Sequence, residues 1–127
     1  IKEYYIANKL KPPHPTWPYD VKTAIIFLNR NLFVTDMTVQ LMRSKCKIPQ
    51  KNFSGKFKYF TGKTPASYIK YHRIECSKII LSNKKIHNGI TAISIELGYR
   101  YLTSFHSAFK EIVGVTPKQY VYKSKKK

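Results

Sequence analysis

Two side chains in this sequence have a type and spacing that could bind a metal ion. His72 and Cys76 lie one turn apart on a predicted helix, and Cys46 is the only other cysteine. Zinc needs four ligands, or three with an open position, and no third ligand stands in range of this pair. The apolar periodicity puts both residues on the inner side of their helix. Packing therefore explains them better, and we predict no metal and no cofactor.

The acidic residues are too scattered for acid–base or metal-assisted catalysis. The six carboxylates form no cluster and belong to Glu3, Asp20, Asp36, Glu75, Glu96 and Glu111. No glycine-rich phosphate loop follows a strand, and no Gly-x-Ser-x-Gly turn is present. His106 has no acid or nucleophile placed by sequence to work with it. The sequence therefore predicts a binding module with no catalytic residues, not an enzyme.

Positive charge dominates the 127 residues. Lys and Arg number 24 against six acidic residues, which gives a net charge of +18. Only four of these lysines lie in the terminal run after Tyr122, so the charge belongs mainly to the folded body. Such a field attracts polyanions, of which nucleic acid is the commonest. A membrane surface is a weaker interpretation, because the apolar helix faces are already used in a core.

The chain divides into a short leading segment and a helical body. Residues 1–11 could form a short helix, and Pro12, Pro13, Pro15 and Pro18 then interrupt regular structure, so we interpret residues 1–18 as a linker or tail of an upstream region. After Asp20 apolar residues recur at spacings of three and four, which indicates helices. The predicted helices cover residues 21–32, a short stretch after Thr38, residues 49–61, 65–81, 90–97 and 102–113, and a last turn from Pro117. Thr116 and Gln119 have the spacing of a capping box at the start of that last turn. Residues 123–127 form a basic, frayed tail.

An internal repeat organises this body. Seven residues recur 52 positions later: Phe53, Phe57, Lys58, Gly62, Thr64, Pro65 and Tyr68 return as Phe105, Phe109, Lys110, Gly114, Thr116, Pro117 and Tyr120. Upstream of the turn, Val39 and Met42 match Ile90 and Ile93 at an offset of 51. Each unit reads as a short helix, a tight turn and a second helix. That is the helix-turn-helix arrangement, whose second helix enters the DNA major groove.

These residues resemble a known family. The stretch ISIELGYRYLTSFHSAFKEIVGVTPKQY (93–120) resembles the signature of AraC/XylS-type transcription regulators, and YIKYHRIECSKIIL (68–81) resembles that family's connecting helix, with Arg73 at its usual arginine. The resemblance implies an all-α fold of about seven helices, in which a long helix joins two helix-turn-helix subdomains. The implied domain spans residues 19–122, with a first subdomain at 19–63, the connecting helix at 64–82 and a second subdomain at 83–122.

A connecting helix of this size suits a two-site reader of DNA. At 1.5 Å per residue, residues 65–81 span about 25 Å. Successive major-groove turns lie about 34 Å apart on one face of DNA. One chain could then read what other proteins need a dimer to read.

Some positions depart from the family pattern. Lys47 stands where glycine is usual, Arg43 where a small residue packs, and Ser94 where alanine is usual. Gly55 and Ser107 occupy positions that often hold base-contacting arginines in relatives. The operator sequence of any relative therefore does not transfer to this chain.

Polar residues on the second helix of each unit are the candidate DNA contacts. Lys51, Ser54, Gly55, Thr103, His106 and Ser107 match base-facing positions of the family, and exposed spacing adds Asn52 and Ser104. Residues at helix starts and flanks, where the DNA phosphates would run, are the candidates for contacts with the DNA backbone: Gln50, Lys58, Lys63, Arg100, Tyr101 and Lys110. For any one of these residues a solvated or helix-capping role is a close alternative.

The sequence thus predicts sequence-specific binding of double-stranded DNA by the C-terminal domain of a bacterial, cytoplasmic, nucleoid-associated regulator. An upstream sensory or receiver domain of the same chain, and RNA polymerase if the protein is an activator, are the expected partners, with no membrane contact by this fragment. The alternative is a non-specific basic protein that binds DNA or RNA in an architectural role.

Overall fold

The computed structural model describes residues 1–49, 51–83 and 89–125, and these residues form eight α-helices and no strand. The all-helical prediction is confirmed: seven helices form in the body, and residues 2–8 form the short helix that the leading segment was expected to allow. The helices are α1 (Lys2–Asn8), α2 (Tyr19–Arg30), α3 (Val39–Cys46), α4 (Phe53–Thr61), α5 (Pro65–Ser82), α6 (Ile90–Glu96), α7 (Leu102–Val113) and α8 (Pro117–Lys125).

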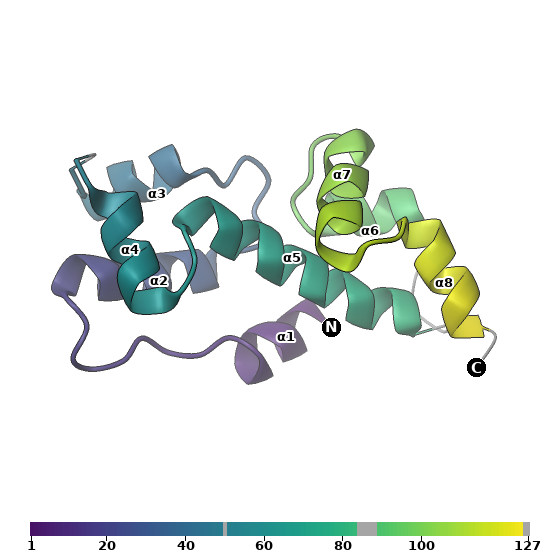
Figure 1. Ribbon diagram of the computed structural model, residues 1–127, viewed down its shortest axis with the longest axis horizontal. Helices are drawn as coiled ribbons and strands as arrows, with labels where there is room; N and C mark the ends of the chain where they lie inside the picture. The colour runs from purple at the N-terminus through teal and green to yellow at the C-terminus, as the bar shows by residue number, and fades with distance from the viewer. Residues whose placement is uncertain (50, 84–88, 126–127) are drawn as a thin grey trace.

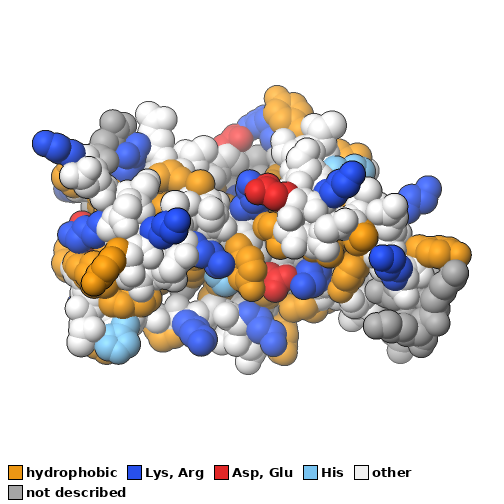
Figure 2. Space-filling model, in the orientation of Figure 1, with side chains coloured by type: hydrophobic (Ala, Val, Ile, Leu, Met, Phe, Trp, Pro, Cys, Tyr) orange, Lys and Arg blue, Asp and Glu red, His pale blue; other side chains and the backbone are white. Residues whose placement is uncertain are grey.

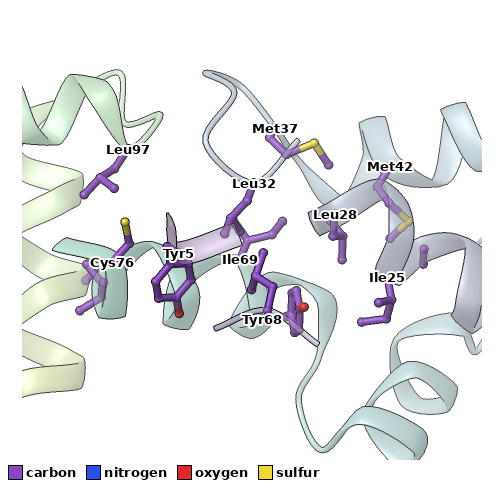
Figure 3. Close-up of a cluster of buried hydrophobic side chains, with 14 of the residues drawn as sticks. Tyr5, Ile25, Leu28, Leu32, Met37, Met42, Tyr68, Ile69, Cys76 and Leu97 are labelled. Carbon is purple, nitrogen blue, oxygen red and sulfur yellow. The ribbon is translucent and has the colours of Figure 1, made fainter. Parts of the chain in front are cut away.

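Helix α5 is the central rod of the molecule (Figure 1). The first unit (α2, α3 and α4) lies on one half of the rod, and the second unit (α6, α7 and α8) lies on the other half. Figure 3 shows buried side chains in a row along α5, from Leu97 and Cys76 at one end to Leu28 and Met42 at the other. The two units therefore share one core that runs the length of the rod.

The repeat predicted from sequence is present as duplicated local geometry. Gly62 and Gly114 end α4 and α7 with left-handed φ angles of 89° and 92°. The hydroxyl of Thr64 accepts a bond from the third backbone N–H into α5, and Thr116 does the same for α8. Gln119 also accepts from the Thr116 N–H, which completes the capping box that the sequence predicted.

The two second helices differ at their starts. Pro49 was predicted to open the first of them, but α4 begins only at Phe53, because Asn52 adopts a left-handed φ of 61° that interrupts the helix. Asparagine tolerates this conformation better than most residues. In the second unit α7 already begins at Leu102, which corresponds to position 50 in the repeat. Helix α4 therefore lacks the first turn that α7 has.

The leading segment packs against the rod. Tyr5 on α1 is 3% exposed, and its hydroxyl lies 2.7 Å from Nδ1 of His72 on α5. Leu10 is buried and Trp17 is partly buried against the same core. Burial lowers the pKa of His72 to about 4, and the charge of Lys63 acts in the same direction. The neutral ring can accept the Tyr5 proton at Nδ1. The boundary proposed at residue 18 stays a prediction.

A buried arginine joins the two units at the middle of the rod. Arg73 on α5 is 6% exposed, and its Nε donates to the carbonyl of Leu32 at 2.8 Å. One terminal nitrogen donates to the carbonyl of Val34 at 2.9 Å, and the other lies 3.5 Å from the carbonyl of Gly98. The first two acceptors precede α3 and the third follows α6. One guanidinium therefore holds a loop of each unit.

Gly98 should not tolerate a side chain, because it lies against this arginine. A Cβ there would lie 2.7 Å from a terminal nitrogen of Arg73 and 2.9 Å from the Phe33 carbonyl oxygen, at a φ of +95°. Gly114 has nearly the same φ, but open space around it. We expect Gly114→Ala to cost about 1 kcal/mol of unfolding free energy through backbone strain alone. Gly98→Ala should cost at least about 2 kcal/mol more. Urea unfolding measures both, and equal losses would contradict the clash.

The stability of the fold should depend on the protonation of His72. An unfolded histidine binds a proton below a pKa of about 6.5, whereas the folded chain resists protonation until about pH 4. The contribution of neutral His72 is therefore complete above about pH 6.5 and is lost as the pH falls toward 4. In His72→Asn, which keeps an acceptor for Tyr5, the free energy of unfolding should fall less over this range, by on the order of 1–2 kcal/mol. Identical pH slopes in denaturant titrations would refute this.

Candidate nucleic-acid interface

Helices α4 and α7 run in the same direction, α4 at the N-terminal end of the rod and α7 across its middle, where Glu111 pairs with Lys70 at 3.0 Å. Their N-terminal ends both point toward the upper edge of Figure 1, while α1 lies at the lower edge. Each is the second helix of a helix-turn-helix pair, α3–α4 or α6–α7, and is called a second helix below. Each is anchored by two buried phenylalanines, Phe53 and Phe57 on α4 and Phe105 and Phe109 on α7. The repeat therefore places two equivalent helices on one edge, each with its polar side outward.

The polar residues of α7 are exposed as the sequence predicted. Thr103, His106 and Lys110 are exposed along this helix, and Phe105, Ala108 and Phe109 lie beneath them. Ser104 and Ser107 are also exposed, but they line a hollow of about 420 Å³ next to the start of α3. The eight base-reading candidates thus do not form one row, because these two serines face the first unit.

The candidates of the first unit are split between a turn and a helix. Ser54, Gly55 and Lys58 are exposed on α4. The assignment of Lys51 and Asn52 to the helix is wrong, because both lie in the turn before it, where Asn52 is left-handed. Gln50 lies outside the described residues. The side chains available on α4 itself are therefore fewer and smaller than those on α7.

The starts of α4 and α7 are electropositive. Neither helix has an acidic residue in its first turn, and no side chain of the N-cap residues Asn52 and Tyr101 accepts a bond from the helix. The first backbone N–H groups have no partner within a helix, and the helix dipole adds a partial positive charge there. Both helix starts thus suit a phosphate oxygen. Figure 2 shows Lys and Arg side chains spread over the visible face, with few acidic ones.

Two residues predicted to contact the DNA backbone, Lys63 and Arg100, already have partners inside the protein. The amine of Lys63 lies 4.2 Å from the centroid of the Tyr71 ring on α5. The guanidinium of Arg100 forms a bidentate ion pair with Asp36, and its Nε lies 3.1 Å from Oδ1. Tyr101 is 63% exposed at the start of α7. Sequence reasoning missed Asp36, because its pairing spans 64 positions and leaves no local pattern.

Other kinds of site find no support in the described part of the chain. No three His, Cys, Asp or Glu side chains in it gather as metal ligands. Burial raises the pKa of Cys46, and it raises that of Cys76 to about 12. Among the same residues, no helix combines the length and apolar character that a membrane span requires. Two tandem units with electropositive second helices on one edge define a double helix-turn-helix domain.

Comparisons with known proteins assign this domain to a family. A family profile described as a helix-turn-helix domain matches residues 44–122, which is more than half of the chain. The chain belongs to the AraC-type helix-turn-helix family of transcription regulators.

Relatives and solved structures agree with this assignment. The chain is 28% identical over 83 residues to the HTH-type transcriptional regulator AlkR of Acinetobacter baylyi, a match that covers 65% of this chain but 26% of that protein. The C-terminal domain of AraT, a response regulator from Geobacillus stearothermophilus, has a similar fold, with a TM-score of 0.76 and 21% identity over 85% of this chain and 88% of that one.

A second similar structure holds DNA. The DNA-binding domain of AdpA, a global transcriptional factor in complex with a target DNA, gives a TM-score of 0.70 and 14% identity, over 81% of this chain and 90% of that one. At these identities the structural likenesses establish the fold. The chain spans about a quarter of the length of AlkR, so it corresponds to one part of such a regulator.

Gly55 offers a stability test on the candidate surface. A Cβ at this exposed helical position meets nothing within 4 Å, so Gly55→Ala should raise the unfolding free energy by about 0.5–1 kcal/mol. Ser107→Ala, at the repeat-equivalent position of α7, is the matched control and should gain at most about 0.5 kcal/mol. Urea unfolding measures both. A loss of stability in Gly55→Ala would mean that the start of α4 requires glycine there.

Proposed function

We propose that this chain binds double-stranded DNA in a sequence-specific manner, with α4 and α7 in successive major-groove segments on one face of the duplex. The observation that carries this proposal is the parallel arrangement of the two helices on one rod. Helix α5 has 18 residues and is about 27 Å long at 1.5 Å per residue. Two parallel helices held apart on such a rod suit successive grooves about 34 Å apart on one face of DNA.

The two helices would contribute unequally to sequence reading. On α7, Thr103 and His106 present polar groups that can contact base edges. In the first unit Gly55 has no side chain, so Lys51 and Ser54 carry the contacts, with Lys51 able to reach the O6 and N7 acceptors of guanine. We therefore expect the half-site read by α7 to be better defined than the half-site read by α4.

Phosphate contacts would supply most of the affinity. Lys58 and Lys110 are exposed near the ends of α4 and α7, and the uncapped helix starts add backbone donors. Neutralised phosphates release counterions, so binding should weaken steeply with salt. A non-specific basic protein would share this behaviour, and the absence of long donors at Gly55 and Ser107 favours that second candidate. Sequence preference, not affinity, separates the two.

The domain would act as the C-terminal part of a cytoplasmic transcription regulator. Its match covers only a quarter of AlkR, which leaves most of that protein for other tasks such as sensing a signal. We infer an upstream sensory or receiver domain before Ile1 in this protein as well, and contact with RNA polymerase if it activates. We also keep residues 19–122 as the domain boundaries.

Selection of genomic DNA fragments by this chain at about 150 mM salt tests the proposal. We expect a two-part motif with its halves about one helical turn apart, bound at least about 10³-fold more tightly than random DNA. Lys51→Ala and His106→Ala should each relax one half of the motif and cost about 1–3 kcal/mol of binding free energy.

Lys9→Ala is the control for loss of charge, because Lys9 follows α1 at the edge opposite the two helices. It should leave the motif unchanged. Enrichment that follows only fragment length or A·T content would contradict specific reading and favour the non-specific candidate.

A further inference from the structure

The two units touch each other directly, as well as through the rod. We define the inter-unit contact as residues 32–36, which connect α2 to α3, against residues 98–100, which connect α6 to α7. Arg73 holds its inner part through the carbonyls of Leu32, Val34 and Gly98. The backbone of Gly98 lies so close to the Phe33 carbonyl that no Cβ fits between them. The inner part of this contact is therefore rigid.

An ion pair closes the outer part of the same contact. Arg100 donates from Nε and one terminal nitrogen to the two carboxylate oxygens of Asp36, a fork-to-fork geometry that fixes orientation as well as distance. Both side chains are solvent-accessible, with 56% of Arg100 and 60% of Asp36 exposed. The Arg100 guanidinium lowers the pKa of the Asp36 carboxyl, so the pair is charged at neutral pH.

Asp36 and Arg100 lie at positions where a small movement would change the placement of α4 relative to α7. Asp36 lies two residues before Thr38, the N-cap of α3, and α3 packs on α2, which also contacts α4. Arg100 lies two residues before Leu102, the first residue of α7. The pair therefore links the start of α7 to the body that carries α4. It adds an outer restraint to those that Arg73, the close Gly98–Phe33 contact and the Lys70–Glu111 ion pair between α5 and α7 already provide.

We propose that the Asp36–Arg100 ion pair fixes the separation of α4 and α7, and thereby limits the domain to a narrow range of half-site spacings. This inference rests on the proposed two-site reading of DNA. It gives Arg100 a positioning role in place of the phosphate contact expected from the sequence, and it explains an acidic residue beside the start of α7. If Arg100 instead served only as a phosphate ligand, Asp36 would merely repel the DNA.

The first test needs no DNA. Spin labels on Lys58→Cys and Lys110→Cys, two exposed and repeat-equivalent positions, report the distance between α4 and α7 by pulsed electron resonance. Cys46→Ser removes the partly exposed native thiol, and Cys76 is buried. We expect Asp36→Asn, which keeps a residue that tolerates the left-handed φ of 65°, to broaden the distance distribution. An unchanged distribution would overturn the proposal.

The second test measures spacing selectivity on the selected two-part site, as the ratio of affinities for the preferred spacing and for spacings one base pair longer or shorter. Asp36→Asn and Arg100→Gln should each lower this ratio by up to about five-fold, the most that an exposed pair usually contributes. The double variant should lower it no further, because both changes break one interaction. Thermal unfolding checks that every variant stays folded.

Asp20→Asn is the matched control. It removes the same charge from an exposed ion pair, with Lys56 at 3.0 Å, that lies inside the first unit. Its spacing ratio should equal that of the parent chain. A uniform loss of affinity at all spacings in Arg100→Gln, with the ratio unchanged, would overturn the positioning role. Absence of a two-part site in the parent chain would refute the proposed function, while the spin-label distances would still decide whether the pair holds the helices.

Discussion

The buried guanidinium of Arg73 is the interaction on which the architecture depends. It lies in the middle of α5 and donates hydrogen bonds to backbone carbonyls of both units. A buried charge without such acceptors is strongly destabilising, so the loops that supply them must stay in place. Those loops precede α3 and α7, and both units are thereby oriented on the rod. Gly98 belongs to the same constraint, because a side chain there would occupy the space of the arginine.

Duplication gives the domain its two surfaces, and local differences make them unequal. The two halves share a glycine that ends the second helix and a threonine that caps the next helix. They also share an aromatic contact: the ring centroids of Phe57 and Tyr68 are 6.0 Å apart, and those of Phe109 and Tyr120 are 5.6 Å apart. The second helices nevertheless start differently, because the left-handed Asn52 removes one turn from α4. Equivalent cores thus support non-equivalent outer faces, and a duplicated fold can read two different half-sites.

The basic residues of this domain have two different roles: some attract the chain to DNA, and others hold the helices that would be placed on it. The net charge of +18 draws the chain to any polyanion, and the lysines responsible need no special position. Placement depends on a few contacts within the protein, among them the buried Arg73 and the exposed pair of Arg100 with Asp36. Some basic side chains therefore organise the fold, and they cannot be counted simply as DNA contacts. Lys63 over the Tyr71 ring is another example.

Local patterns in the sequence were sufficient to predict the helical fold, the repeat, the bounds of α7 and the capping box at Thr116 and Gln119. Such features depend on residues within one or two turns of each other, which periodicity and cap spacing report directly. The late start of α4, the docking of Tyr5 on His72 and the pairing of Arg100 with Asp36 became visible only in the tertiary structure. Each of the two pairings joins side chains more than 60 positions apart. Asparagine tolerates a left-handed φ, but its presence at position 52 does not by itself predict that conformation. The sequence alone thus determined which helices form, while long-range packing decided how they face each other and which basic residues remain available.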